Sequence, residues 1–156
     1  MWNLATGELE KTLTGHSNSV DSVAVSGNKI VSASSASSVS RDSTIKVWNL
    51  ATGELEKTLA GHSDSVLSVA VSGDKIVSGS SDSTIKVWNL ATGELEQTLT
   101  GHSSYVYNVV VSGDRIVSDS YDNTIKVWNL ATGKFCLLYT SPSPRDATLS
   151  RMPSSA

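Results

Sequence analysis

The sequence TIKVWNLATG occupies residues 84–93, and the same ten residues recur at 44–53 and 124–133. Its second half, WNLATG, also opens the chain at residues 2–7. The tryptophans are spaced by 46, 40 and 40 residues, at Trp2, Trp48, Trp88 and Trp128. A period of about 40 residues is typical of arrays in which each repeat is one supersecondary unit that buries its apolar faces against its neighbours. The chain is therefore a repeat array, which favours a binding function.

Residues 61–99 show the repeat unit most clearly. Residues 66–71 are apolar and β-branched enough to predict a strand buried on both faces. A turn follows at Gly73, because glycine supplies the positive φ that short hairpin loops require, and residues 94–99 alternate charged and apolar side chains as a half-exposed outer strand does. The pattern predicts strands at 8–13, 20–25, 29–34, 44–48, 54–59, 66–71, 75–80, 84–88, 94–99, 106–111, 115–120 and 124–128.

Four short strands in about 40 residues are typical of a propeller blade. The residues Gly61-His62, Ser78, Asp82 and Trp88-Asn89 resemble the WD40 repeat, with Asn in place of the usual final Asp. The resemblance extends from residue 1 to about 135, since Gly-His recurs at 15, 61 and 101 and an Asp precedes each Trp by six residues at 42, 82 and 122. It implies an all-β fold, a partial WD40 β-propeller that forms an open arc of about three four-stranded antiparallel blades.

The repeats divide the chain into segments. We expect residues 1–14 to be the remnant of a preceding blade with an outer strand at 8–13, 15–60 to be a first blade with a Ser-rich insertion near 35–41, 61–100 a second blade, and 101–135 a third blade without its outer strand. Residues 136–156 share nothing with the repeat and resemble a translated sequencing-library adaptor. We expect them to be a non-native, disordered tail, although a genuine disordered tail would have similar composition.

Each repeat carries a His, a Ser, an Asp and a Trp. In WD40 proteins the matching residues form a hydrogen-bonded network, so the resemblance implies a structural role, and recurrence with the fold period argues against a catalytic triad. In the first repeat, strand position favours Ser32 as the network serine, and Ser38 is the alternative because it has the usual spacing to Asp42. The expected network residues are His16, Ser32, Asp42, Trp48, His62, Ser78, Asp82, Trp88, His102, Ser118, Asp122 and Trp128.

Composition excludes several classes of partner. Twelve basic and fifteen acidic residues are interspersed, with a net charge of −3, so no basic stripe is present to bind nucleic acid. Apolar runs are far shorter than the roughly 20 residues that span a bilayer, and the N-terminus of this sequence has no basic segment followed by an apolar stretch. We therefore expect no membrane partner and a cytoplasmic or otherwise intracellular location, with Met1 an internal codon and the native N-terminus missing. The sole cysteine, Cys136, cannot form an internal disulfide.

Positions that differ between the repeats are where specificity could reside. The third repeat has tyrosine at three such positions, which in WD40 proteins lie on the rim of the top surface where partners most often dock. Tyr105 and Tyr107 share one parity around Val106, and Tyr121 precedes Asp122, so we expect the three to cluster. The predicted partner-binding residues are Tyr105, Tyr107, Tyr121, Leu67, Ser65, Ser81, Asp21 and Arg41. The alternative is that these tyrosines only fill the central channel or lie on the surface without function.

These observations favour a non-catalytic scaffold that binds a protein or peptide partner. No metal-ligand spacing and no glycine-rich phosphate loop occurs in the sequence, so we expect no metal, cofactor or enzymatic activity. One alternative is the regulatory or targeting part of a larger multidomain enzyme such as a signalling kinase or NTPase, and another is a structural spacer. Exposed strand edges would also allow copies of the chain to associate, for instance as a six-bladed ring of two copies.

Overall fold

The protein forms three successive β-sheets, each with four antiparallel strands. The structure, a computed structural model, describes residues 1–37 and 42–140. In this part of the chain no helix is long and apolar enough to cross a membrane. Blade 1 has β1 (Val20–Ser26), β2 (Lys29–Ser34), β3 (Thr44–Asn49) and β4 (Leu55–Ala60); blade 2 has β5 (Val66–Ser72), β6 (Lys75–Ser80), β7 (Ile85–Asn89) and β8 (Leu95–Leu99); blade 3 has β9 (Val106–Ser112), β10 (Arg115–Ser120), β11 (Thr124–Asn129) and β12 (Phe135–Thr140).

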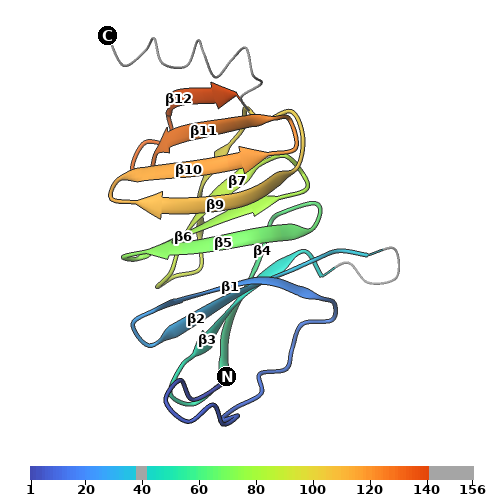
Figure 1. Cartoon of the computed structure of the whole chain (residues 1–156), viewed down its shortest axis with the longest axis vertical. Coiled ribbons are helices and arrows are strands. Elements are labelled where there is room, and N and C mark those ends of the chain that lie inside the picture. The colour runs from blue at the N-terminus through green and yellow to red at the C-terminus, as the bar shows by residue number, and fades with distance from the viewer. Residues whose placement is uncertain (38–41, 141–156) are drawn as a thin grey trace.

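The blades form an open arc. Blades 1 and 3 lie at opposite ends of the stack in Figure 1, with blade 2 between them, so the sheets do not close into a ring. Within each blade the strands pair in chain order, from the inner strand to the outer one. This confirms the predicted all-β propeller arc.

Two recurring turns explain why the strands begin and end where they do. The first hairpin of blade 2 has a two-residue loop, and Gly73 there has a φ of 59°, which residues other than glycine rarely adopt. The turn after the third strand is held by Asn89, whose Oδ1 accepts the backbone N–H groups of Ala91 and Thr92 at 2.8 and 2.9 Å. Because only a carbonyl oxygen is needed for these bonds, Asn can replace the usual Asp without losing a contact.

Neighbouring blades pack through apolar faces. We call the face that carries the tryptophan the front face of a blade and the opposite one its back face. Burying a Val or Ile side chain stabilises a fold by about 1.5 to 3 kcal/mol, so these interfaces are the main apolar core. The back face of blade 1 and the front face of blade 2 contribute Val31, Ala33, Ile45, Val47, Leu59, Val66, Val69, Ile76 and Trp88; blades 2 and 3 contribute Val77, Ile85, Val87, Leu99, Val106, Val109, Ile116 and Trp128.

The outer strand predicted at 8–13 does not form. Residues 1–19 contain only an isolated bridge between Trp2 and Leu9. A two-stranded pairing is marginal in water unless a third strand or a packed face supports it, and nothing described pairs with the far side of this segment. The segment nevertheless keeps an outer-strand position: a Cβ on Gly53 would lie 3.1 Å from Leu13 Cδ2, as one on Gly93 would lie 3.0 Å from Leu59 Cδ2.

The expectation that the third blade lacks an outer strand is wrong. The backbone of β12, Phe135–Thr140, pairs antiparallel with β11, and its register shift next to Trp128 matches those next to Trp48 and Trp88. Phe, Leu, Tyr and Thr have high or moderate β-propensity, and pairing uses the backbone, so a sequence unlike the repeat can still complete the sheet. The predicted disordered tail at 141–156 lies outside the described residues.

Candidate protein-interaction site

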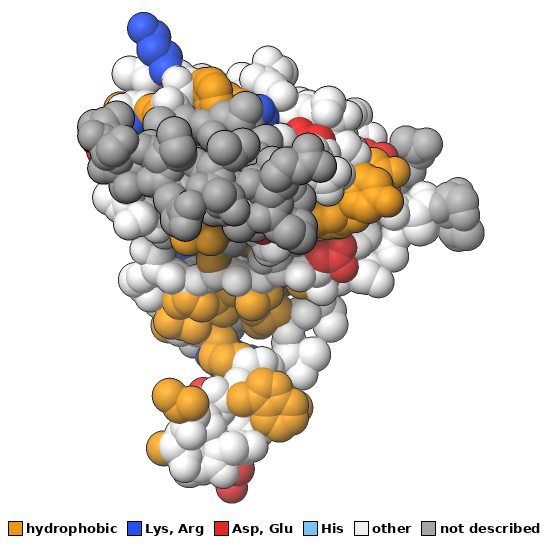
Figure 2. Space-filling model, turned by 45° about the horizontal axis from the view of Figure 1, so that its top comes forward, with side chains coloured by type: hydrophobic (Ala, Val, Ile, Leu, Met, Phe, Trp, Pro, Cys, Tyr) orange, Lys and Arg blue, Asp and Glu red, His pale blue; other side chains and the backbone are white. Residues whose placement is uncertain are grey.

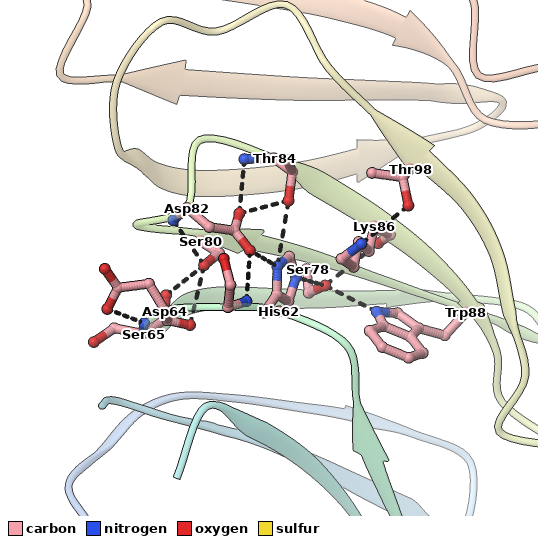
Figure 3. Close-up of polar contacts among 11 residues, drawn as sticks. His62, Asp64, Ser65, Ser78, Ser80, Asp82, Thr84, Lys86, Trp88 and Thr98 are labelled. Carbon is pink, nitrogen blue, oxygen red and sulfur yellow. Dashed lines mark hydrogen bonds and ion pairs between the residues drawn. The ribbon is translucent and has the colours of Figure 1, made fainter. Parts of the chain in front are cut away.

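Four side chains of blade 2 are joined by hydrogen bonds into one network (Figure 3). His62 Nδ1 lies 2.8 Å from Asp82 Oδ2, and His62 Nε2 lies 2.7 Å from Ser78 Oγ. Trp88 donates its indole N–H to the same Ser78 Oγ at 2.9 Å. These distances suit an imidazole that donates to the carboxylate from Nδ1 and accepts the serine proton at Nε2. The network joins the loop before β5 to β6, β7 and the turn between them.

The same network occurs in all three blades. His16 and His102 lie 2.9 Å from Asp42 and Asp122, and both lie 2.7 Å from the Oγ atoms of Ser32 and Ser118. Trp48 and Trp128 donate to those serines at 2.9 Å. Among the described residues, no buried side-chain nitrogen or oxygen is left without a partner. The arrangement follows the fold period, as a structural element does and a single active site does not.

Ser32 is the serine that completes the network in blade 1. Its Oγ is the atom that both His16 and Trp48 contact, and Ser32 lies on β2 as Ser78 lies on β6. The alternative, Ser38, lies outside the described residues. Strand position therefore decided the role of this serine, and spacing to the aspartate did not.

The network controls the charge of its aspartates. Burial raises the pKa of Asp82, but hydrogen bonds from His62 and Thr84, the nearby imidazole and the Ser63 N–H together hold that pKa well below its usual range. The pKa values of Asp42 and Asp122 are lowered in the same way, with burial opposed by hydrogen bonds from Thr44 and Thr124 among others. The three carboxylates are therefore ionised at neutral pH, where a protonated carboxyl would be a weaker acceptor.

The three tyrosines of blade 3 lie together. The ring centroids of Tyr105 and Tyr107 are 6.4 Å apart, and Tyr121 lies 6.0 Å from each of them. All three are exposed, at 48%, 43% and 64% of their surface. The Tyr121 N–H also donates to the Tyr105 carbonyl at 2.9 Å, which ties the two strand ends together. We call Tyr105, Tyr107 and Tyr121 the tyrosine rim.

A β-bulge places Tyr107 on this rim. Val106 pairs with Ser120 and Asn108 pairs with Asp119, so Tyr107 has no partner in the ladder. Asp21 and Leu67 are the unpaired residues at the same bulge in blades 1 and 2. A bulge residue leaves the ladder and its side chain is redirected. Simple strand alternation, on which the predicted clustering rested, therefore does not describe this position.

The other predicted rim residues have varied surroundings. Ser65, Leu67 and Ser81 are partly buried in blade 2, and Ser65 Oγ accepts the Ala36 N–H from the first blade's insertion at 2.8 Å. In blade 1, Asp21 is exposed and accepts a hydrogen bond from Ser35 Oγ. Arg41 lies outside the described residues.

Sequence reasoning missed Ser35 on the rim. Its N–H donates to the Ser19 carbonyl at 3.0 Å, the bond that Ser81 and Tyr121 make to Ser65 and Tyr105. The insertion therefore follows Ser35, and Ser35 takes the position that was expected of Arg41. Counting forward from Ser32 on β2 would have found it, because the strand sets this register and the insertion only lengthens the turn.

The described residues contain no group of three or more His, Cys, Asp or Glu side chains placed to hold a metal ion. The aspartates inside the blades have lowered pKa values, and their carboxylates are already bonded to the histidines. The tyrosine rim offers aromatic surface and hydroxyl groups instead. Such a surface can bind a partner by contact and hydrogen bonding.

Comparisons with known proteins identify the repeat. The family model "WD domain, G-beta repeat" matches residues 7–49, 53–89 and 93–129. The structure is similar to the crystal structures of two computationally designed proteins. One is Ika4, with 36% identity over 81% of this chain and 75% of that chain and a TM-score of 0.72; the other is Ika8, with 35% identity over 88% of this chain and 42% of that chain and a TM-score of 0.77.

A search of curated proteins finds no significant match. The family model alone covers well over half of the residues, and each of its three matches contains one Trp-Asn pair and one His, Ser and Asp network. WD40 repeats generally serve as protein-interaction scaffolds and are typically not catalytic. This chain belongs to the WD40 repeat family.

Proposed function

We propose that this chain is a protein-interaction scaffold without chemistry of its own, and that it docks a protein or peptide on the tyrosine rim. The observation that carries the proposal is the contact among three exposed tyrosine rings at one end of blade 3. The equivalent positions in blade 2 hold Ser65, Leu67 and Ser81. The rim therefore distinguishes one blade within an otherwise near-identical array.

Tyrosine suits a docking site because it combines a large rigid ring with a polar tip. The rings of Tyr105 and Tyr107 meet nearly edge to face, with an interplanar angle of 78°, and those of Tyr107 and Tyr121 do so at 86°. Rings that already pack on each other lose less conformational freedom when a partner binds. This preorganisation supports a binding role better than three separate surface tyrosines would.

A selection experiment tests the proposal with peptides in place of the natural partner. A phage-displayed library of random peptides is selected on the whole chain, and the selected peptides are then titrated against variants by isothermal calorimetry. Truncating an interface tyrosine typically costs about 1 to 3 kcal/mol of affinity. We therefore expect the Tyr105→Ala, Tyr107→Ala, Tyr121→Ala triple variant to bind at least about a hundredfold more weakly, since each 1.4 kcal/mol is tenfold.

Two controls define the result. Asp114→Ala lies in the loop at the opposite end of blade 3 and should leave peptide affinity unchanged. Tyr107→Phe keeps the ring and should keep most of the affinity if the ring carries it. Selected peptides that bind the triple alanine variant as tightly as the original chain would refute docking on the tyrosine rim.

A further inference from the structure

The two ends of the arc expose the two halves of an interblade interface. The front face of blade 1 carries Val20, Val23, Ile30 and Trp48, which correspond to Val66, Val69, Ile76 and Trp88 of blade 2. Val66 and Val69 are 0% and 6% exposed against blade 1, whereas Val20 and Val23 are 50% and 63% exposed. These side chains line an apolar groove of about 630 Å³. Blade 1 therefore presents the surface that a preceding blade covers elsewhere in the chain.

The back face of blade 3 is the matching half. Its Val117, Ile125 and Val127 correspond to Val31, Ile45 and Val47 in blade 1, which are at most 1% exposed against blade 2. Ile125 is 37% exposed, and no other blade among the described residues covers it. Figure 2 shows hydrophobic side chains gathered toward the lower end of the stack, where blade 1 lies. The apolar part of a front-to-back contact between two copies is therefore present in the chain.

At each internal interface, a backbone N–H of one blade donates a hydrogen bond to a serine side chain of the preceding blade. The Val69 N–H donates to Ser22 Oγ and the Val109 N–H to Ser68 Oγ, both at 3.2 Å. In blade 3 the position of these serines is taken by Asn108, which is larger and donates its Nδ2 to Asp119 Oδ2 at 3.5 Å. Blade 3 thus has a larger side chain than serine at this position, and that side chain is bonded to Asp119 of its own blade.

Two further back-face positions are larger in blade 3. Asp119 stands where the other blades have Ala33 and Gly79. A Cβ on Gly79 would lie only 2.8 Å from Val106 Cγ1 and 3.0 Å from Val109 Cγ1, so this position fits closely against the next blade. Val110 likewise replaces the alanines that pack against the neighbouring blade, Ala24 and Ala70.

Of Asn108, Val110 and Asp119, Asp119 is the most unfavourable for a contact between the back face of blade 3 and the front face of blade 1 in another copy. In a front-to-back contact it would meet the counterparts of Val106 and Val109, which are Val20 and Val23 of the second copy. These side chains offer no hydrogen bond, so a buried Asp119 would keep only its long contact with Asn108 Nδ2. Burying a charge with one weak partner is costly. Asn108 and Val110 add bulk around it, and overpacking of a close-fitting interface also destabilises. Inward-pointing charges are a known means of blocking unwanted sheet association.

We infer that the front face of blade 1 binds the back face of blade 3 in a second copy of the chain, and that Asn108, Val110 and Asp119 weaken this contact. A second copy fits the front face of blade 1 because the chain already contains two front-to-back interfaces of this kind, between blades 1 and 2 and between blades 2 and 3. Residues 8–13 already hold an outer-strand position beside the groove. Since β12 of the second copy would fall on the same place, one of these two segments is displaced in the bound state.

Sedimentation equilibrium of the whole chain tests this inference. The Asn108→Ser, Val110→Ala, Asp119→Ala triple variant restores the side chains of blade 1 at these positions. We expect its self-association constant to be at least about tenfold larger than that of the original chain, because removing a carboxylate that the contact would bury with one long hydrogen bond recovers its desolvation cost. The assemblies should have the mass of two or more chains.

A matched variant separates docking from non-specific aggregation. Val23→Glu places a charge in the groove at a side chain that is 63% exposed. Added to the triple variant, it should return the association constant to the original value. The inference is overturned if the triple variant associates no more than the original chain, or if Val23→Glu leaves its association unchanged. The tyrosine rim is not altered by these variants, so peptide binding tests the proposed function separately.

Discussion

Replacing Ser78 by alanine should destabilise the protein more than any other single hydroxyl deletion in blade 2. Ser78 is 0% exposed, and its Oγ is the shared partner of His62 Nε2 at 2.7 Å and Trp88 Nε1 at 2.9 Å. Ser78→Ala leaves two buried nitrogen atoms without partners. Each such group costs about 1 to 3 kcal/mol, so the free energy of unfolding should fall by about 3 kcal/mol when partial relaxation is included.

Urea unfolding followed by tryptophan fluorescence measures this loss as a shift of the midpoint at constant slope. Ser63→Ala is the matched control, because Ser63 is exposed and only its backbone N–H contacts Asp82; it should change stability by less than about 0.5 kcal/mol. In a Trp88→Phe background the indole donor is absent, so Ser78→Ala should cost roughly 1 kcal/mol less than in the original chain. A loss below about 1 kcal/mol for Ser78→Ala would refute the shared-acceptor account.

Three other outcomes follow from the blade structure. The lowered pKa values of Asp42, Asp82 and Asp122 mean that their contribution to stability is present above the unfolded pKa of about 3.9 and is lost as the pH falls below it; acid titration of the urea midpoint should show this loss, and Asp82→Asn should reduce it. Gly79→Val should cost about 1 to 3 kcal/mol by thermal or urea unfolding, because its side chain overpacks against Val106 and Val109, and a fully retained midpoint would contradict the close fit. Ser83 has a φ of 73°, where Asn is better tolerated than Ser, and Asn123 has the same conformation in blade 3; Ser83→Asn should therefore raise the unfolding free energy by about 0.5 kcal/mol.

The blade interiors could be predicted from sequence because every level of information agreed there. Apolar runs, turn glycines and the recurring His, Ser, Asp and Trp residues all pointed to the same four strands. The errors in predicting strands occurred at the ends of the described chain. Residues 8–13 carry a strand pattern without a neighbouring ladder, and β12 forms in a segment that lacks the pattern. In both cases the available backbone partner decided the outcome, and a partner is not visible in local sequence.

The clustering of the tyrosines could be predicted, but not its geometric cause. Comparison of the repeats singled out Tyr105, Tyr107 and Tyr121 as the positions where blade 3 differs. The bulge at Tyr107 has no signature in the residue types, since Asp21 and Leu67 occupy it in the other blades. It is a property of how two strands of unequal length are paired. Similarly, only the backbone bond from Ser35 to Ser19 shows where the insertion begins.

The bulge also makes the array modular. The residue at its apex takes no part in the ladder, so Asp21, Leu67 and Tyr107 can differ in charge, size and aromaticity while the strands around them pair in the same register. Mutational drift or laboratory randomisation at this one place per blade can diversify recognition without changing the architecture. A library built from identical blades would need to vary only these apical residues and their rim neighbours to generate new specificities on a constant frame.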